Sequence, residues 1–412
     1  MPKRKNEQSG FQDYHRGNGR RPDNFRKRKY ELPGIQDLSK EQERVLRTCA
    51  KEDRHLIIGG PGTGKSVLAL LRSRRHQTDN DDYIFLVYNH LLNDASRQLF
   101  GTKLESRTWI AWFIEIFEEI TNKCTPRCDP DNNGFQKIDW NNVENIIQNM
   151  PAGGNERRPF LVIDEGQDMP PEFYNSLLNL GFDRFFVLAD QNQQITESNS
   201  SRIDLENGLV IDTHDVFELR HNYRNRYKVA RLANAFFTGD PASPPPDLPD
   251  FSSGPIPTLY TYGPDRLVTV ATRVLRLADR DPRKLIGIIS PNNEVRKRYV
   301  NALRSAEVKL DNPAPAINTY HSRNRTEVAF DEGGILVINA QTCKGLEFDI
   351  VLLADIDEHF FRRDDPDATK RRFYVMVARA KEGVFMFMKR DGNKAIEQIL
   401  PNDTSILQRK EL

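Results

Sequence analysis

The sequence has few cysteines and no long apolar run, and each absence excludes a class of protein. Its four cysteines are too few for a disulfide framework in a chain of 412 residues. No segment approaches the ~18 apolar residues of a membrane span, and the opening Met-Pro-Lys-Arg-Lys forms no apolar signal segment. We therefore expect a soluble, cytoplasmic protein with no membrane partner; a nuclear or nucleoid-associated location also fits.

Net charge is nearly absent overall, but it is distributed unevenly. Residues 1–30 carry ten Lys and Arg against three acidic residues, while the whole chain carries only +1. This segment has almost no aliphatic side chains, which predicts a basic disordered tail over residues 1–30. An arm that binds nucleic acid or an acidic partner is one interpretation, and a solvated terminus is the other.

Short apolar segments alternate with segments of helical period along the rest of the chain. Strand-length segments lie at 55–58, 83–88, 160–163, 185–189, 285–289, 335–339, 350–354 and 384–388, and helical segments lie at 66–76, 171–180 and 292–305. Continuous apolar strands between helices predict an α/β protein whose parallel sheets are covered by helices on both faces. The strands form two sets, before and after about residue 215, each large enough for one domain.

A glycine-rich loop joins the first strand segment to the first helical segment. It reads Gly59, Gly60, Pro61, Gly62, Thr63, Gly64, Lys65 and Ser66, the G-x-x-x-x-G-K-S pattern in its strand–loop–helix context. Glycines let backbone N–H groups surround an anion, and the helix N-terminus adds positive potential. We expect Lys65 to reach the phosphates of ATP and the Ser66 hydroxyl to bind Mg²⁺.

Acidic residues follow the strand segment at 160–163. Asp164 fits the carboxylate that completes a Mg²⁺ site, and Glu165 fits the group that polarises the attacking water. An acidic turn without catalytic function is the alternative, which the phosphate loop disfavours. The sequence therefore predicts an ATPase that uses Mg²⁺.

The sequence Asp164-Glu-Gly-Gln-Asp168 resembles the D-E-A-Q-D of the UvrD/Rep-like superfamily 1 DNA helicases, and six further motifs follow that family's order. The segments that carry the resemblance lie at 38–42, 59–66, 185–195, 218–224, 341–348 and 374–380. The resemblance implies that Gln42 reads adenine, Gln193 senses the γ-phosphate and Tyr223 stacks on the base. It also implies that Arg224 contacts the γ-phosphate, Glu347 lies near the ribose and Arg379 is the arginine finger.

The resemblance also implies the architecture: two RecA-like P-loop domains with the ATP cleft between them. Domain 1 would span 31–215, with a reduced insertion at about 101–159, and domain 2 would span 216–412, with a Pro-rich connector at 239–257. The large second insertion of full-length relatives has no counterpart, so the chain resembles a compact member. Motif position alone suggests Asn89, Thr108, Trp109 and His321 as strand contacts, with core packing as the alternative for Trp109.

Two functions fit this sequence. The first is an ATP-dependent single-strand nucleic-acid translocase or helicase, with DNA favoured and 3′→5′ movement taken from the resemblance. The second is an ATP-binding regulatory subunit of a multiprotein system, such as anti-phage defence, which licenses a partner nuclease. The reduced first insertion and the missing second insertion support the second function. The segments 86–92 and 107–113, which depart from the family's strand-contact motifs, support it too.

Overall fold

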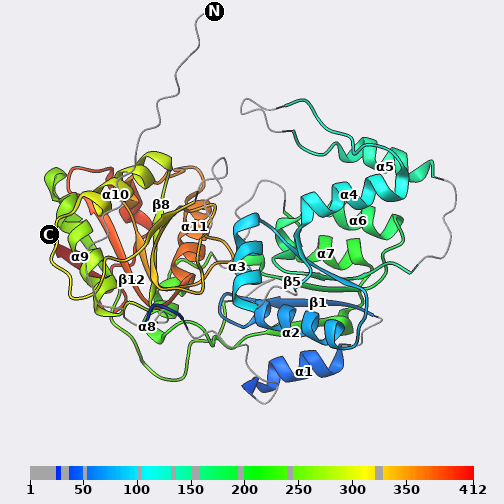
Figure 1. Cartoon of the computed structure of the whole chain (residues 1–412), viewed down its shortest axis with the longest axis horizontal. Coiled ribbons are helices and arrows are strands. Elements are labelled where there is room, and N and C mark those ends of the chain that lie inside the picture. The colour runs from blue at the N-terminus through cyan, green and yellow to red at the C-terminus, as the bar shows by residue number, and fades with distance from the viewer. Residues whose placement is uncertain are drawn as a thin grey trace, which may run out of the picture.

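Two parallel sheets, one from each half of the chain, organise the protein into two lobes that lie side by side (Figure 1). This computed structural model describes residues 25–28, 37–49, 53–100, 104–130, 136–150, 157–193, 199–238, 245–320 and 328–412. No helix in these ranges is long and apolar enough to cross a membrane. The α/β architecture with helix-covered parallel sheets, expected from the sequence, is confirmed.

The first sheet has the order β3-β2-β4-β5-β1-β6, and its described pairings are all parallel. Its strands are β1 (Arg54–Gly59), β2 (Tyr83–Val87), β3 (Ser106–Thr108), β4 (Phe160–Ile163), β5 (Phe185–Ala189) and β6 (Val216–Leu219). The helices around it are α1 (Lys40–Thr48), α2 (Lys65–Thr78), α3 (His90–Phe100), α4 (Trp109–Thr121), α5 (Trp140–Gln148), α6 (Pro171–Asn179) and α7 (Arg202–Leu209).

Successive side chains along a strand of the first sheet are buried on opposite faces of the sheet, as expected for a pleated strand. Leu161 and Ile163 of β4 pack with α4, α5, α6 and α7, whereas Phe160 and Val162 pack with α1 and α2. Both faces are therefore covered, which explains why β4 is apolar at every position.

The second sheet has the order β13-β7-β12-β11-β8-β10-β9, again with parallel described pairings. Its strands are β7 (Thr258–Tyr262), β8 (Leu285–Ser290), β9 (Ile317–Thr319), β10 (Gly334–Asn339), β11 (Phe348–Leu353), β12 (Ala380–Lys389) and β13 (Gln408–Glu411). The helices α9 (Leu267–Arg280) and α10 (Asn293–Ser305) cover one face, and α8 (Tyr227–Asn234) and α11 (Pro366–Ala378) cover the other.

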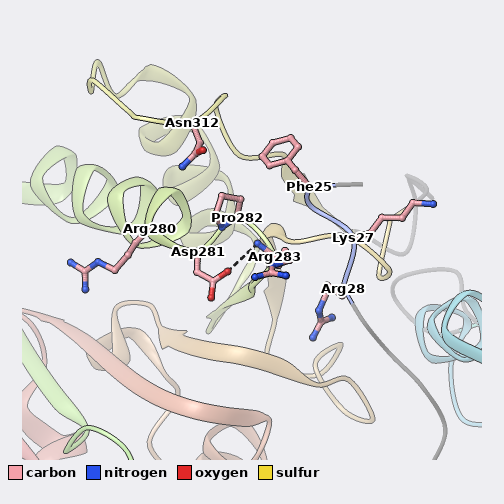
Figure 2. Close-up of a pocket in the computed structure, with 8 residues that line it drawn as sticks. All are labelled: Phe25, Lys27, Arg28, Arg280, Asp281, Pro282, Arg283 and Asn312. Carbon is pink, nitrogen blue, oxygen red and sulfur yellow. Dashed lines mark hydrogen bonds between the residues drawn. The ribbon is translucent and has the colours of Figure 1, made fainter. Parts of the chain in front are cut away.

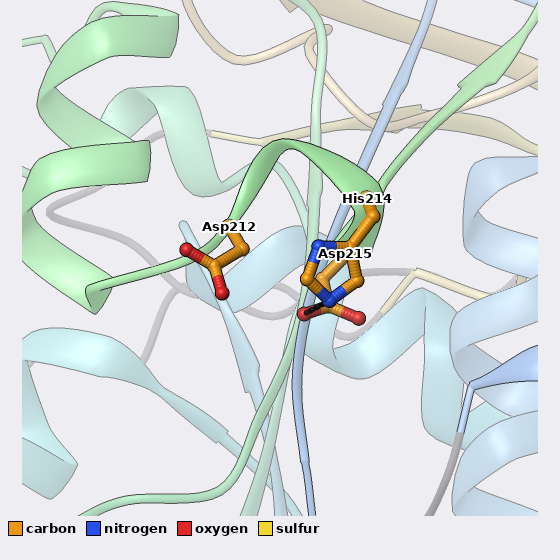
Figure 3. Close-up of side chains that lie close together, drawn as sticks. All are labelled: Asp212, His214 and Asp215. Atoms are coloured by element: carbon orange, nitrogen blue, oxygen red, sulfur yellow. Dashed lines mark ion pairs between the residues drawn. The ribbon is translucent and has the colours of Figure 1, made fainter.

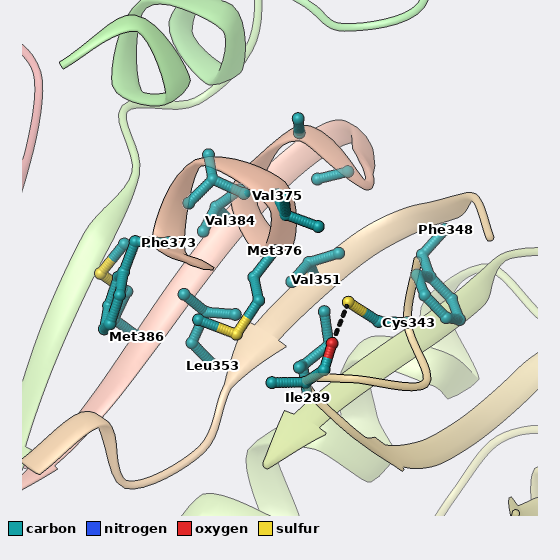
Figure 4. Close-up of a cluster of buried hydrophobic side chains, with 14 of the residues drawn as sticks. Ile289, Cys343, Phe348, Val351, Leu353, Phe373, Val375, Met376, Val384 and Met386 are labelled. Carbon is teal, nitrogen blue, oxygen red and sulfur yellow. Dashed lines mark hydrogen bonds between the residues drawn. The ribbon is translucent and has the colours of Figure 1, made fainter. Parts of the chain in front are cut away.

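The core beneath α11 extends into the first half of the chain. Figure 4 shows Phe373, Val375 and Met376 packed against the sheet residues beside them. Leu91 and Ala95 of α3, a helix of the first half, belong to the same buried cluster. Apolar burial therefore joins the two halves in addition to the polar contacts described below.

Four short 3₁₀ segments follow the strands β4, β5 and β11 or precede β6. They are η2 (Gly166–Asp168), η3 (Gln191–Gln193), η4 (Thr213–Asp215) and η6 (Ile356–Glu358). Further 3₁₀ segments are η5 (Pro264–Arg266) and η7 (Lys394–Ile399). Two of these segments, η2 and η3, directly follow β4 and β5, so they place polar residues at the carboxyl edge of the first sheet.

Three sequence-based boundaries need correction. The first sheet continues to Leu219 rather than ending at residue 215, because β6 pairs with β1. The segment 101–159, expected to be an insertion, contributes β3 to the sheet itself. Residues 25–28, expected to be disordered, lie against the second half, with Lys27 bridged to Glu332. Of the Pro-rich connector, 239–244 lies outside the described residues, and 245–257 contains no helix or strand.

Candidate nucleotide-binding site

The glycine loop at 59–66 runs from the end of β1 into α2, as predicted. Gly62 and Gly64 have φ values of +81° and +89°, which L side chains rarely adopt. A Cβ atom at Gly62 would lie 2.3 Å from Asn222 Oδ1, and one at Gly64 would lie 2.2 Å from Gln42 Nε2. Both positions therefore require glycine, for conformation and for space.

Lys65 is buried at the start of α2, where its ammonium group faces the loop. Its Nζ donates to the carbonyl oxygens of Gly59 at 2.7 Å and Gly60 at 3.0 Å, and lies 3.6 Å from Asp190 Oδ2. The Lys65 ammonium group is therefore placed where it would contact an anion bound by the N–H groups of the loop.

Ser66 and Asp164 lie together at the carboxyl end of β4. The Ser66 hydroxyl hydrogen-bonds the buried Asp164 carboxylate, and burial together with the Glu165 charge raises the pKa of Asp164. Burial also acts to raise the pKa of Glu165, but Lys344, Lys65 and further cationic charge outweigh it, so this pKa is lowered. Carboxylate and hydroxyl oxygens are the ligands that Mg²⁺ prefers, so this pair fits the predicted metal.

A chain of polar contacts leads from Lys65 to the second half of the protein. Asp190, which follows β5, accepts a hydrogen bond of 2.5 Å from Gln193 Nε2. The Gln193 side-chain oxygen accepts a hydrogen bond from Arg379, at the end of α11. Arg379 is 1 % exposed, and its Nε also donates to Val375 O at 3.2 Å. Residues predicted from three separate motifs therefore meet in one buried cluster.

Lys344 makes a second buried contact between the halves. Its Nζ lies 2.5 Å from Asp168 Oδ1 and also donates to the carbonyl oxygen of Gln193. Burial raises the pKa of Asp168, and the Lys344 ammonium opposes that rise. Because Lys344 follows β10 and Asp168 follows β4, this ion pair fixes the second half against the first.

A cavity of about 490 Å³ opens beside the glycine loop, between the two halves. The predicted nucleotide-binding residues that line it come from four motifs: Gln42, Gly62, Ser66, Tyr223, Arg224 and Glu347. Its size lies within the usual range of ligand pockets, ~300–1,000 Å³. The structure thus brings the residues expected for adenine, ribose and phosphate around one space.

The side chains at the mouth of this cavity are held by polar contacts. Gln42 Nε2 donates to Thr63 O at 3.0 Å, and Gln42 also forms the capping box of α1 with Ser39. The Tyr223 backbone N–H donates to Gly62 O at 2.8 Å, while its side chain is 49 % exposed. A half-exposed ring over the cavity is available for stacking on a base.

Arg224 and Glu347 form an ion pair at the cavity wall, and Lys381 lies 3.0 Å from the second Glu347 oxygen. Burial acts to raise the pKa of Glu347, but Arg224 and Lys381 outweigh it and lower the pKa to about 2. Arg224 contacts a carboxylate in this structure, and its predicted contact with a phosphate stays a prediction.

Of the residues suggested as nucleic-acid contacts, those that the structure describes do not line the nucleotide cavity. Trp109 is 6 % exposed and packs edge-on against Phe173 at 5.1 Å, so it is a core residue rather than a stacking platform. Thr108 is also buried, at the junction of β3 and α4, which contradicts a strand contact. The Asn89 side chain accepts from Leu92 N at 2.8 Å and so caps α3. His321 lies outside the described residues.

Several residues of the cluster had no role in the sequence-based prediction. Asp168, Asp190 and Lys344 are buried charges, and Gln167 links Glu165 Oε2 at 2.8 Å to the Asp190 backbone N–H at 2.9 Å. Asp190 could have been found from its place in the sequence, because it directly follows the strand β5 as Asp164 follows β4. The carboxyl ends of parallel strands lie at one edge of a sheet, so the two residues are expected to be neighbours. The Lys344–Asp168 pair had no such signal, since it joins residues that are 176 positions apart.

A group of potential metal ligands lies away from this cluster, at η4. Figure 3 shows Asp212, His214 and Asp215 close together, and their ligand atoms lie within 4.8 Å of one another. Asp215 lies 3.3 Å from His214 Nε2 and 3.5 Å from His55 Nδ1. These contacts describe an ion-pair group at the surface, and we assign no metal to it.

One family model matches part of the chain. The model of the UvrD-like helicase C-terminal domain matches residues 334–387, a stretch that contains Lys344, Glu347 and Arg379. Among solved structures, the chain is similar to the C-terminal domain of a possible DNA helicase from Lactobacillus plantarum WCFS1. That similarity has 15 % sequence identity and a TM-score of 0.33, and it covers 45 % of this chain and 97 % of the other. No curated protein matches the chain.

The family match lies in the half that supplies Arg379 and Lys344 to the shared cluster. It supports a helicase-type function. The motifs of the chain and the match over residues 334–387 together fit the UvrD/Rep-like helicase family.

Proposed function

We propose that this chain is an ATP-dependent single-strand nucleic-acid translocase or helicase, with DNA as the favoured track and movement in the 3′→5′ direction. The observation that carries the proposal is the buried series of contacts from Lys65 through Asp190 and Gln193 to Arg379. A hydrolytic site built from both halves makes the fit between them depend on the nucleotide.

Five residues of the site have defined parts in this proposal. Lys65 and the loop N–H groups bind the phosphates of ATP, and Glu165 orients and polarises the attacking water. Ser66 and Asp164 hold Mg²⁺, which neutralises charge that develops on the phosphates. Arg379 stabilises the transferring phosphoryl group from the second half, a contribution that is worth about 10³–10⁵ in rate in related phosphoryl transfers.

Coupling to movement follows from where these residues reside. Arg379 and Lys344 belong to the second half, whereas Gln193 and Asp168 belong to the first. Loss of the γ-phosphate removes a shared partner of the two halves, so hydrolysis favours their separation. A strand that contacts both halves would be advanced by repeated closing and opening.

The test is steady-state ATP hydrolysis by the purified chain. It is run without polymer and with single-stranded DNA, duplex DNA or single-stranded RNA, and Lys65→Ala provides the background rate. We expect strong stimulation by single-stranded DNA that weakens with salt, because phosphate contacts release counterions. A strand labelled at either end then reports direction, and we expect arrival at the 5′ end.

One result would overturn the proposal, and two others would change its track or its direction. Hydrolysis that is indifferent to every polymer would favour the regulatory subunit that licenses a partner nuclease. Stimulation by RNA alone would make RNA the track. Arrival of the protein at the 3′ end would reverse the proposed direction without removing the translocase activity.

A further inference from the structure

A short basic segment before the first helix lies on the second half of the protein. Lys27 forms an antiparallel bridge with Glu332, and the Gly333 N–H donates to Arg26 O at 2.9 Å. We call residues 25–28 the arm. The side-chain partners of the arm lie 287 to 321 positions away in the chain, so its position reflects specific contacts rather than local folding.

Two guanidinium groups fasten the arm. Arg26 donates to Pro313 O at 2.8 Å, and Arg28 lies 3.1 Å from Asp349 Oδ2. The side chain of Arg28 is 11 % exposed, so this ion pair is largely sheltered from solvent. Arg28 also lines the nucleotide cavity, which places the arm between that cavity and a second hollow on its other side.

This second hollow, the arm cleft, has a volume of about 770 Å³. Figure 2 shows that the arm forms one wall and that the turn after α9 forms the other. Its charged lining residues are four cations and one acid: Lys27, Arg28, Arg280, Arg283 and Asp281. The cleft is therefore strongly basic in a protein whose total charge is only +1.

The cationic side chains of the arm cleft differ in whether they form an ion pair or are exposed to solvent. Arg28 is paired with Asp349, and Asp281 lies 3.7 Å from Lys284. By contrast, the side chains of Lys27, Arg280 and Arg283 are exposed at the cleft. Arginine binds phosphate oxygens through two parallel N–H groups, so exposed arginines in a hollow favour a phosphate ligand.

An aromatic ring and the adjoining sequence favour a polymer over a small anion. Phe25 lines the cleft next to the cations, and bases stack on such rings in single-strand binding sites. The chain that precedes Phe25, residues 1–24, contains six Lys and Arg against three acidic residues. A basic segment attached to a basic cleft suits a ligand whose charge repeats along its length.

We propose that the arm cleft binds the phosphate backbone of a nucleic-acid strand, as a contact separate from the ATP cavity. The choice of ligand rests on the proposed function. The cleft lies between the arm and the second half, to which the arm is bound, so it would hold the strand to that half whatever nucleotide is bound.

The test compares charge reversal inside and outside the cleft. Binding of a fluorescein-labelled single-stranded DNA is measured by anisotropy at several salt concentrations, with the full chain. The variant is Arg280→Glu with Arg283→Glu, two exposed side chains that take no part in the nucleotide site. The control is Arg276→Glu with Arg304→Glu, which makes the same charge change on exposed positions of α9 and α10 outside the cleft.

We expect the cleft variant to bind DNA about tenfold or more weakly at low salt, and the control to bind within about threefold of wild type. Each phosphate contact with a single strand contributes ~0.7 to the slope of the logarithm of the DNA-binding constant against the logarithm of the salt concentration. The loss of two contacts should therefore make this slope shallower by about 1.4. The milder pair Arg280→Ala with Arg283→Ala should give an intermediate loss. Inorganic phosphate at matched ionic strength should not displace the DNA.

The outcomes separate this proposal from the proposed function. Equal affinity and slope in wild type, variant and control would overturn the arm cleft as a strand contact, while DNA-stimulated hydrolysis would leave the translocase standing. Displacement by phosphate would identify a small-anion site instead. Loss of binding in the variant without any stimulation of hydrolysis in wild type would support the cleft and overturn the translocase. A wild-type chain that binds no nucleic acid would overturn both.

Discussion

Glu165→Gln is the substitution whose consequences the structure defines most closely. The change keeps the shape of the side chain and removes its charge. The buried cluster around it contains three cations, Lys65, Lys344 and Arg379, and four carboxylates, Asp164, Glu165, Asp168 and Asp190. Because the pKa of Glu165 is lowered, its carboxylate is ionised, and the substitution removes one negative charge from this cluster.

The two effects of this change have opposite directions. A glutamine cannot polarise water, and loss of a general base costs about 10²–10⁴ in rate. This corresponds to about 2.7–5.4 kcal/mol in the activation free energy, at 1.36 kcal/mol per tenfold. ATP is an anion, so a cluster with less negative charge should bind it as tightly as wild type or more tightly.

The assay measures kcat by phosphate release and the dissociation constant of ATP by calorimetry. Glu172→Gln, at an exposed position in the first turn of α6, is the matched control and should equal wild type in both. Wild-type turnover in Glu165→Gln would refute the assignment of Glu165 to water. A loss of ATP affinity beyond tenfold would show instead that Glu165 acts in binding.

Three further predictions follow from single contacts. Lys65→Ala should abolish hydrolysis, because the phosphates lose their buried cation; a rate above one-tenth of wild type would contradict this. Gln42→Leu should raise the KM for ATP about 2–10-fold, which corresponds to the loss of one hydrogen bond of about 0.5–1.5 kcal/mol. The ratio of kcat/KM for ATP to that for GTP should also fall. An unchanged ratio would show that Gln42 does not recognise the base. Ionised Glu347 stabilises the fold beside Arg224, and its pKa is lowered from 4.5 to about 2. The melting temperature of Glu347→Gln should therefore lie furthest below that of wild type above pH 4.5, and the difference should shrink as the pH falls toward 2. A difference that does not change with pH would contradict this.

Strands that lie inside the sheets were largely predictable from the sequence, and edge strands were not. β4 and β5 are buried at every position, so their apolar runs are continuous. β3, β6, β9 and β13 are edge strands of three or four residues, and most of their side chains are only partly buried or exposed. Such segments form because a neighbouring strand supplies hydrogen bonds, and the chain itself carries little signal of that.

The same distinction applies to the candidate site. The glycine loop and Asp164 are local patterns with a fixed chemistry, and the structure places them together. The Lys344–Asp168 contact depends on how the two halves meet, which no local pattern encodes. Trp109 shows the opposite case: its motif position suggested a strand contact, whereas the structure supports the alternative of core packing, against Phe173 of α6.

The arm shows why composition alone was insufficient at the N-terminus. Low apolar content predicted disorder across residues 1–30, yet backbone and guanidinium hydrogen bonds position residues 25–28. Hydrogen bonds to a charged group contribute about 1.5–3 kcal/mol each, so a few of them order a short segment without a hydrophobic core. The partners at 331–333 are far away in the sequence and were therefore invisible to it.

The central claim is that both halves of the chain build one site for ATP hydrolysis, and Arg379 tests it most directly. The measurement is kcat and ATP affinity of Arg379→Ala, with Arg371→Ala, a partly exposed arginine of the same helix, as the control. The account predicts that kcat falls by about 10³ or more while ATP affinity changes less than tenfold, and that the control behaves as wild type. Wild-type turnover in Arg379→Ala would contradict the account, because the first half would then hydrolyse ATP without the second.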